Sequence, residues 1–175
     1  LTKVFDDIDD LRVDEVDTLR YKLKHQELLL KLLTKKDSFI RQALLDVNLP
    51  LLNTRLRYYL DAIGLFHNVT FTKGMTVAIT QFNNSIDFSN LSTGQKARVN
   101  LAIAFAFRDI VQERHQKINF CILDECMDHG LSNLGVKLAA KMIKTVAVDN
   151  DLSMYVITHR DEIKASFDAT LTTSL

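Results

Sequence analysis

The stretch Leu91-Ser92-Thr93-Gly94-Gln95 governs the fold of the second half of this chain, because a long apolar segment follows it directly. Residues 93–114 carry apolar side chains nearly all round a helical projection, which predicts a helix covered on most sides. The opening turn of a helix leaves amide protons without partners and attracts anions. Ser92 and Gly94 therefore fit a phosphate-binding helix start, in which a hydroxyl donates and no Cβ obstructs the ligand. The alternative is that Ser92 is an ordinary N-cap.

No phosphate-gripping loop accompanies this helix start. The chain has five glycines, and none belongs to a Gly-x-x-x-x-Gly-Lys-Ser/Thr motif. A helix start suited to phosphate therefore stands in a chain that has no phosphate loop of its own.

Composition favours one α/β domain with an appendage. The chain has 175 residues, 47% of them apolar, with 22 Lys and Arg against 22 Asp and Glu, so the net charge neither requires nor excludes a nucleic-acid partner. Cys121 and Cys126 are too few for a secreted disulfide framework, which favours a reducing, intracellular setting. We expect no signal peptide and no membrane span. The start at Leu1 suggests a segment of a longer protein.

A heptad pattern runs from Val16 to Leu44, with apolar residues at most seam positions. It predicts a coiled-coil arm, although an amphipathic helix packed on its own domain has the same period. Asn48 and Pro50 are expected to end this helix, because proline lacks an amide proton. We therefore divide the chain into a descending arm at 1–47 and a lobe at 48–175.

Within the lobe, helical and β-rich segments alternate, which predicts an α/β architecture. The expected elements are a helix at 51–62 closing at Gly64, a hairpin of strands at 65–72 and 75–82, a polar loop at 83–90, a strand at 120–123 buried on both faces, a helix at 133–148, a strand at 153–158, a short helix after His159 and a last strand near 169–173.

Two carboxylates follow the apolar run Phe120 to Leu123. In open α/β sheets, ligands bind at the carboxyl ends of the strands, so Asp124 is a candidate ligand for Mg²⁺ through water. Glu125, expected to point the other way along the strand, is a candidate to orient or deprotonate an attacking water. The alternative is a strand that ends in two solvated acids.

His159 ends the next predicted strand, which runs from Ser153 to Thr158. Neighbouring parallel strands would bring it to the same rim as Glu125, where an imidazole can bond to a γ-phosphate and sense its loss. A lone histidine is otherwise most often structural.

The order of these features resembles the carboxyl-terminal lobe of an ABC-type P-loop ATPase head. Leu91 to Gln95 resembles the signature motif, Phe120 to Glu125 resembles Walker B, and His159 resembles the switch histidine. Together with the arm, they are similar to the SMC-like branch, and within it to SbcC-type ATPases of DNA double-strand-break repair nuclease complexes, a group that includes the large subunits of T-even phage recombination endonucleases.

The resemblance implies a role for each matching residue. Glu125 and His159 would be catalytic, Asp124 would hold magnesium, and the signature residues Leu91, Ser92, Thr93, Gly94 and Gln95 would bind nucleotide in trans. Asp128, Leu131 and Ser132 would form the D-loop. Ser132 stands where the family has aspartate, which puts communication between paired sites in doubt, and Asp128 is a possible substitute. Thr93 stands where many members have glycine.

The resemblance also implies cofactors and partners. The cofactors are ATP and Mg²⁺. The partners are a Walker A lobe of the same protein, a second copy in a head-to-head homodimer, an SbcD-type nuclease subunit and DNA. Apart from the resemblance, Lys73, Lys96 and Arg98 are candidates for DNA contact by their charge alone, and solvated surface charges are the alternative. The setting would be the cytoplasm or nucleoid, or the host cytoplasm for a phage protein. The alternatives are a chromosome-organising SMC-type or other recombination ATPase without a nuclease, and a non-catalytic dimerisation or DNA-binding module.

Overall fold

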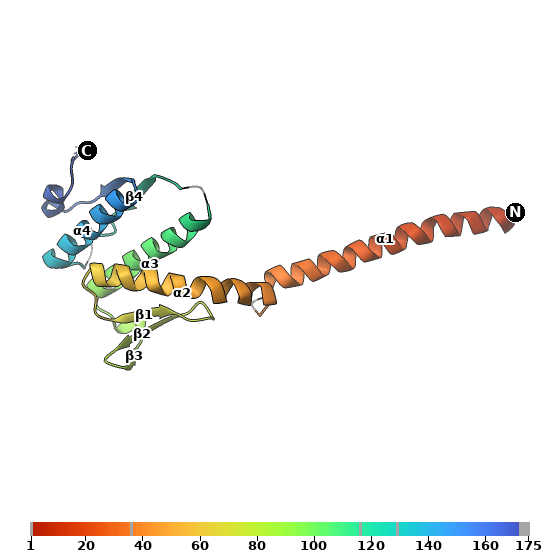
Figure 1. Cartoon of the computed structure of the whole chain (residues 1–175), viewed down its shortest axis with the longest axis horizontal. Helices are drawn as coiled ribbons and strands as arrows, with labels where there is room; N and C mark the ends of the chain where they lie inside the picture. The colour runs from red at the N-terminus through yellow and green to blue at the C-terminus, as the bar shows by residue number, and fades with distance from the viewer. Residues whose placement is uncertain (1, 36, 116, 129, 172–175) are drawn as a thin grey trace. The chain divides into compact units, whose positions relative to one another are not determined.

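The computed structural model describes residues 2–35, 37–115, 117–128 and 130–171, which form two compact units, Leu1–Val47 and Asn48–Leu175. The helices are α1 (Thr2–Thr34), α2 (Phe39–Ala62), α3 (Thr93–Arg114) and α4 (Asn133–Asp149) (Figure 1). The strands are β1 (Asn68–Phe71), β2 (Val77–Gln81), β3 (Asn84–Ile86), β4 (Phe120–Asp124) and β5 (Ser153–Ile157). Two 3₁₀ helices are η1 (Phe88–Asn90) and η2 (Asp161–Ser166).

In the first unit, α1 exposes the apolar seam of its heptads. Leu19, Leu23, Leu30 and Leu33 are between 57% and 71% exposed. A stripe of leucines with this exposure is the surface that a second helix covers in a coiled coil. The pairing itself stays a prediction.

The predicted unbroken helix from Val16 to Leu44 is wrong, because α1 ends at Thr34 and α2 begins at Phe39. The Arg41 amide donates to the Ser38 hydroxyl at 3.3 Å, and the Gln42 amide donates to the Ser38 carbonyl at 3.0 Å. Ser38 therefore caps a new helix. A serine before two apolar residues is a sequence signal for a helix start. It was not recognised because Ile40 and Leu44 also fit the heptad pattern, which predicted a continuous helix.

The predicted helix end at Asn48 and Pro50 is also wrong, because α2 continues through both residues. A proline inside a helix costs about 3 kcal/mol. Downstream of it, α2 buries one side of its surface, and each fully buried apolar side chain contributes roughly 1.5–3 kcal/mol. The buried residues are Leu52, Leu56, Tyr59 and Leu60. Tertiary burial thus offsets the local penalty.

The predicted hairpin is present, and it continues into a third strand. β1 pairs with β2, and β2 pairs with β3, both antiparallel. Phe82 and Asn83 form the second turn with φ of 49° and 65°, the left-handed geometry of tight hairpins. The predicted polar loop at 83–90 is therefore wrong for β3, because this turn lacks the glycine that usually marks it.

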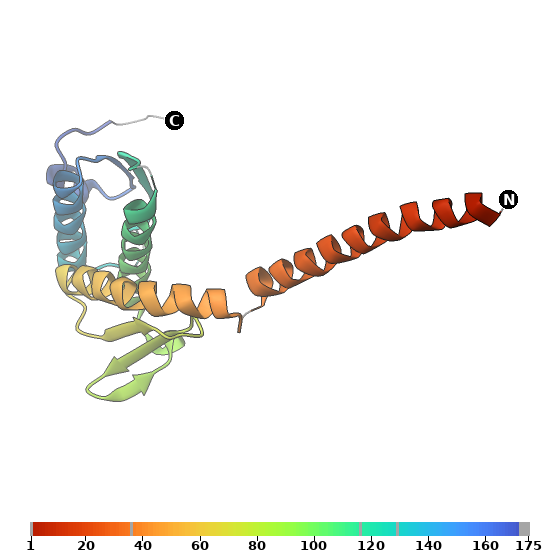
Figure 2. The ribbon, with the colours of Figure 1, turned by 45° about the vertical axis from the view of Figure 1, so that its right-hand side comes forward.

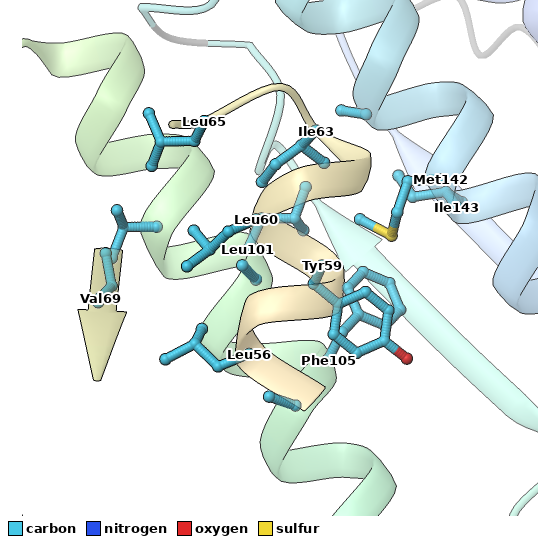
Figure 3. Packing of buried hydrophobic residues seen from close by; sticks show 14 of the residues in the cluster. Leu56, Tyr59, Leu60, Ile63, Leu65, Val69, Leu101, Phe105, Met142 and Ile143 are labelled. Atoms are coloured by element: carbon cyan, nitrogen blue, oxygen red, sulfur yellow. The ribbon is translucent and has the colours of Figure 1, made fainter. Parts of the chain in front are cut away.

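The core of the second unit lies where α2, α3 and α4 meet. Leu56 and Leu60 of α2 are fully buried, and Phe105 of α3 is 2% exposed. Figure 3 shows that Leu56, Tyr59, Leu60 and Ile63 face Leu101 and Phe105 of α3 on one side and Met142 and Ile143 of α4 on another. The Tyr59 hydroxyl donates to Asp109 at 2.7 Å, and burial together with this bond raises the pKa of Tyr59 above its ordinary value.

The second sheet is the parallel pair β4 and β5, with Phe120 opposite Ser153 and Asp124 opposite Ile157. One face packs on the core through Leu123, Met154 and Val156. The other face is bare, which contradicts the prediction of a strand buried on both faces. Its members are each 51–53% exposed: Phe120, Ile122, Tyr155 and Ile157.

The carboxyl-terminal elements agree in part with the prediction. The expected helix after His159 is the 3₁₀ helix η2, which buries Ile163 completely. The last strand predicted near 169–173 does not form at 169–171, and residues 172–175 lie outside the described residues. In Figure 2, α3 and α4 stand side by side, with the antiparallel sheet on the far side of α2.

Candidate functional site

The ends of β4 and β5 bring Glu125 and His159 into contact. The parallel register places Asp124 opposite Ile157, and the Glu125 amide donates to the Ile157 carbonyl at 2.9 Å. Beyond the strands, His159 Nε2 lies 2.9 Å from Glu125 Oε1. The prediction that these two strands are parallel neighbours is confirmed. The catalytic roles of the two side chains stay predictions.

Glu125 does not continue the alternation of β4, so the expectation that it points the other way along the strand is wrong. β4 ends at Asp124, and Glu125 has a φ of 49°. A non-glycine residue in the left-handed region is strained by about 1–2 kcal/mol, and such strain is concentrated at functional sites. The chain turns sharply here, and this turn directs the Glu125 carboxylate to His159.

Asp124 lines an open hollow of about 460 Å³ between α3 and β4. Glu125 and Cys126 line the same hollow, and α3 contributes Thr93, Lys96 and Asn100. Mg²⁺ in nucleotide sites is held by one or two carboxylates together with water and phosphate oxygens. The exposed Asp124 carboxylate fits that donor set. Burial raises the pKa of the Cys126 thiol, which keeps it protonated.

Ser92 is the N-cap of α3, and its motif is a complete capping box. The Gln95 amide donates to Ser92 Oγ at 3.3 Å, and the Ser92 amide donates to Gln95 Oε1 at 2.8 Å. The side chain of Ser92 is also exposed. A hydroxyl that accepts one bond still has a proton to donate. Capping and phosphate binding are therefore compatible at this residue.

Gly94 packs against the loop that follows β4. A Cβ at Gly94 would overlap the carbonyl oxygen of Gly130, and one at Gly130 would lie 2.6 Å from Thr93 Cγ2. Gly130 also has a φ of 76°. Close packing against the Gly130 backbone thus requires a glycine at position 94. This requirement is separate from the approach of a phosphate, which was inferred from the sequence. Gly130 was missed because nothing near it in the sequence links it to α3.

Replacing Gly94 with alanine is expected to destabilise the protein without any ligand. The new methyl group must displace the Gly130 backbone, and overpacking of this kind costs about 1–3 kcal/mol. Chemical denaturation of the Gly94→Ala chain measures the loss. Gly74→Ala is the matched control, because a Cβ there meets its nearest atom, Thr72 Oγ1, at an ordinary 3.6 Å. Equal stability of the two variants would contradict the packing role.

The residues predicted to form the D-loop have structural partners of their own. Ser132 caps α4 by accepting a hydrogen bond from the Gly135 amide at 3.2 Å, a role that aspartate fills equally well. Leu131 is buried, as is Leu91 before α3. Asp128 contacts Thr158 and the amide of His159. Ser132, at the position where the resemblance implies an aspartate, therefore supplies the helix cap.

Lys96 and Arg98, which were candidates for DNA contact, make internal hydrogen bonds. Lys96 donates to the Ser89 carbonyl at 2.8 Å. Arg98 donates to the carbonyls of Gly94 and Gly64, each at 3.2 Å. Lys73 lies in the turn between β1 and β2. Arg160 donates to the Leu131 carbonyl at 2.9 Å. The sequence did not predict this contact, and its only signal was the position of Arg160 directly after His159.

Among the residues that the structure describes, no group of three or more His, Cys, Asp or Glu side chains is arranged to hold a metal ion. Over the same residues, no helix combines the length and the apolar character needed to cross a bilayer.

No model of a known protein family matches the chain. Two curated relatives are both named exonuclease subunit 2: that of Escherichia phage RB69 is 27% identical and that of Enterobacteria phage T4 is 28% identical, each over 128 residues. The match covers 72% of this chain and 22% of each relative. The chain thus spans about a fifth of the length of these relatives.

The fold matches a solved Smc head. The Pyrococcus furiosus Smc head domain with an extended coiled coil, bound to the C-terminal domain of ScpA, superposes with a TM-score of 0.57. The match has 18% identity and covers 91% of this chain and 40% of the Smc chain. The fold is therefore that of the carboxyl-terminal part of an ABC-type ATPase head with a coiled coil. With the phage relatives, it confirms the resemblance to a carboxyl-terminal segment of an SMC-like or SbcC-like ATPase.

Proposed function

We propose that this chain is the carboxyl-terminal half of the ATPase head of an SMC-like DNA repair and recombination protein. The observation that carries the proposal is the pair Glu125 and His159 at 2.9 Å, beside the Asp124 carboxylate at the carboxyl end of β4. A base and a partner that orients it, next to a ligand for magnesium, suit hydrolysis of a nucleoside triphosphate.

In the proposed mechanism, Glu125 orients the attacking water and accepts its proton. His159, with a proton on each ring nitrogen, would donate one hydrogen bond to Glu125 and one to the γ-phosphate, which links the base to the phosphate that leaves. Asp124 would hold Mg²⁺, which neutralises charge on the phosphate oxygens when it is bound. Positioning and charge stabilisation of this kind are the main contributions of a protein to phosphoryl transfer.

The bare face of the parallel sheet supports a second lobe in the complete protein. Ile122 and Tyr155 are 53% and 52% exposed and lie opposite each other at the centre of a pair of parallel strands, and such strands are normally covered on both faces. The Walker A lobe, which carries the missing phosphate loop, would cover this face and complete the site. The low coverage of the phage relatives, 22%, agrees with a longer polypeptide.

The exposed start of α3 supports a dimer closed by ATP. Ser92 and the first turn of α3 would bind the γ-phosphate held by a second copy, in a head-to-head arrangement. Head closure and release would control the access of an SbcD-type nuclease subunit to DNA ends, inside the cell. The name of the phage relatives, exonuclease subunit 2, supports a nuclease partner.

A chromosome-organising Smc-type ATPase is the second candidate, because the superposed Smc head is one bound to ScpA. Affinity purification of the complete protein separates the two functions. A nuclease subunit in stoichiometric amount supports the repair assignment. Recovery of a non-nuclease partner instead, with no nuclease activity in the purified complex, would support the Smc-type alternative.

The 175-residue chain alone is expected to hydrolyse no ATP, because it lacks the lysine and the amide cradle that bind the β-phosphate. Phosphate release by the purified chain, with and without magnesium, measures this. Magnesium-dependent turnover that disappears in Glu125→Gln would contradict the composite site. Turnover that persists in this variant would indicate a contaminating enzyme.

A further inference from the structure

The Asp128 carboxylate accepts hydrogen bonds from the segment that carries His159, the predicted switch histidine. The His159 amide donates to Asp128 Oδ2 at 2.8 Å, and the Thr158 hydroxyl bonds to Asp128 Oδ1. The Arg160 amide in turn donates to Thr158 Oγ1 at 3.1 Å. One carboxylate therefore organises three consecutive residues that lie about thirty positions away in the sequence.

The loop that carries Asp128 is itself fixed from the other side. The Asp128 amide donates to the Glu125 carbonyl at 3.2 Å. The guanidinium of Arg160 donates to the carbonyls of Met127, at 3.4 Å, and Leu131, at 2.9 Å. Met127 is 1% exposed and anchors the loop in the core. The bonds run in both directions, so the loop and the histidine segment form one unit.

Packing does not hold the imidazole of His159. Its side chain is 78% exposed, and that of Glu125 is 50% exposed. A ring with so few neighbours takes its position from its backbone, and this backbone is held by Asp128. The 2.9 Å contact between His159 Nε2 and Glu125 Oε1 therefore depends on the Asp128 carboxylate, which bonds to the His159 amide.

We propose that Asp128 is a positioning residue, which sets His159 against Glu125 within its own chain. The inference rests on the proposed ATPase function. It gives Asp128 a different role from communication with the neighbouring site across the dimer. Loss of the carboxylate would free the Thr158–Arg160 backbone, leave Glu125 without its oriented partner, and leave the ATP-binding surfaces intact.

Amide hydrogen exchange in the 175-residue chain tests the contact without ATP. Asp128→Ala is expected to speed exchange at His159 roughly tenfold, because the amide loses a charged acceptor. Exchange in α3 should stay unchanged and report an intact fold. Asp128→Asn keeps the volume and one acceptor oxygen, and it is the deciding variant if alanine unfolds the chain. Asp161→Asn is the control, since its carboxylate pairs with Lys164 at 2.6 Å. Unchanged His159 exchange in both Asp128 variants would overturn the proposal.

ATPase kinetics of the complete protein test the consequence. Asp128→Ala is expected to lower kcat roughly tenfold to a hundredfold with the KM for ATP nearly unchanged, because the lost interaction acts on the transition state. Asp128→Asn should be intermediate, and Asp161→Asn should match the parent. Normal kcat, or lost ATP-driven dimerisation with normal His159 exchange, would overturn the positioning role. If the parent protein hydrolyses no ATP, the proposed function fails, and the exchange data still decide whether Asp128 holds His159.

Discussion

Replacing Glu125 with glutamine in the complete protein is expected to reduce ATP turnover by a factor of about 10²–10⁴. Glutamine keeps the shape of the side chain and an oxygen for the bond with His159, but it cannot accept a proton from water. ATP binding requires neither the charge nor the base. ATP-driven dimerisation should therefore persist and become long-lived, because the step that releases the heads is blocked.

Steady-state phosphate release and size-exclusion chromatography with ATP measure the two effects separately. Glu113→Gln is the matched control, because this exposed glutamate of α3 pairs with Arg55 at 3.2 Å, away from the candidate site. The control should retain parental turnover. Near-normal turnover in Glu125→Gln would exclude this residue as the base. Loss of dimerisation in the same variant would argue against a composite site that binds ATP before it hydrolyses it.

Replacing Ser92 with arginine is expected to abolish ATP-driven dimerisation and, with it, turnover. The new side chain adds bulk at the helix start where the partner's γ-phosphate would approach. It also removes the hydroxyl that accepts the Gln95 amide, which costs about 1 kcal/mol of helix stability. Loss of the N-cap alone would lower the stability of the chain without preventing dimerisation. The effect of the lost cap must therefore be separated from the effect of the added bulk.

Two further variants make that separation. Ser92→Asp keeps the N-cap, since aspartate caps helices as well as serine does, but it repels phosphate. It should therefore lose dimerisation while the chain keeps its stability. Ser89→Arg puts the same bulk and charge three residues upstream, on an exposed position of η1, and should dimerise normally. Dimerisation of both Ser92 variants with ATP, measured by light scattering, would rule out the signature role.

The sequence predicted those parts of the fold in which one local pattern dominates. The apolar surface of residues 93–114 and the short apolar runs before Asp124 and His159 gave a helix and two parallel strands at nearly the observed bounds. At Pro50, the rule that proline ends a helix predicted a wrong helix end. Burial of the leucines that follow in α2 outweighs the free-energy cost of a proline inside the helix. At Ser38, the N-cap was missed because the heptad pattern from Val16 to Leu44 continues through this residue.

The residues of the candidate site could be predicted from the sequence, but the hydrogen bonds between them could not. Asp124, Glu125 and His159 could be found because each follows an apolar strand. The left-handed backbone of Glu125 has no local signal, since glutamate does not favour it. The bond from the His159 amide to Asp128 depends on the loop geometry after β4 and on the register of β4 and β5. Such long-range bonds become visible only when the strands are paired.

The close approach of Gly94 and Gly130 has a consequence for how the protein tolerates mutation. A Cβ at Gly94 would meet the Gly130 backbone, so no change of a side chain can make room for it. A Cβ at Gly130 would meet the Thr93 side chain, and the φ of 76° at Gly130 strains any other residue there. In a library that substitutes every position, both glycines should be depleted even under selection for folding alone. Positions where only nucleotide contact matters should be depleted solely when ATP turnover is required.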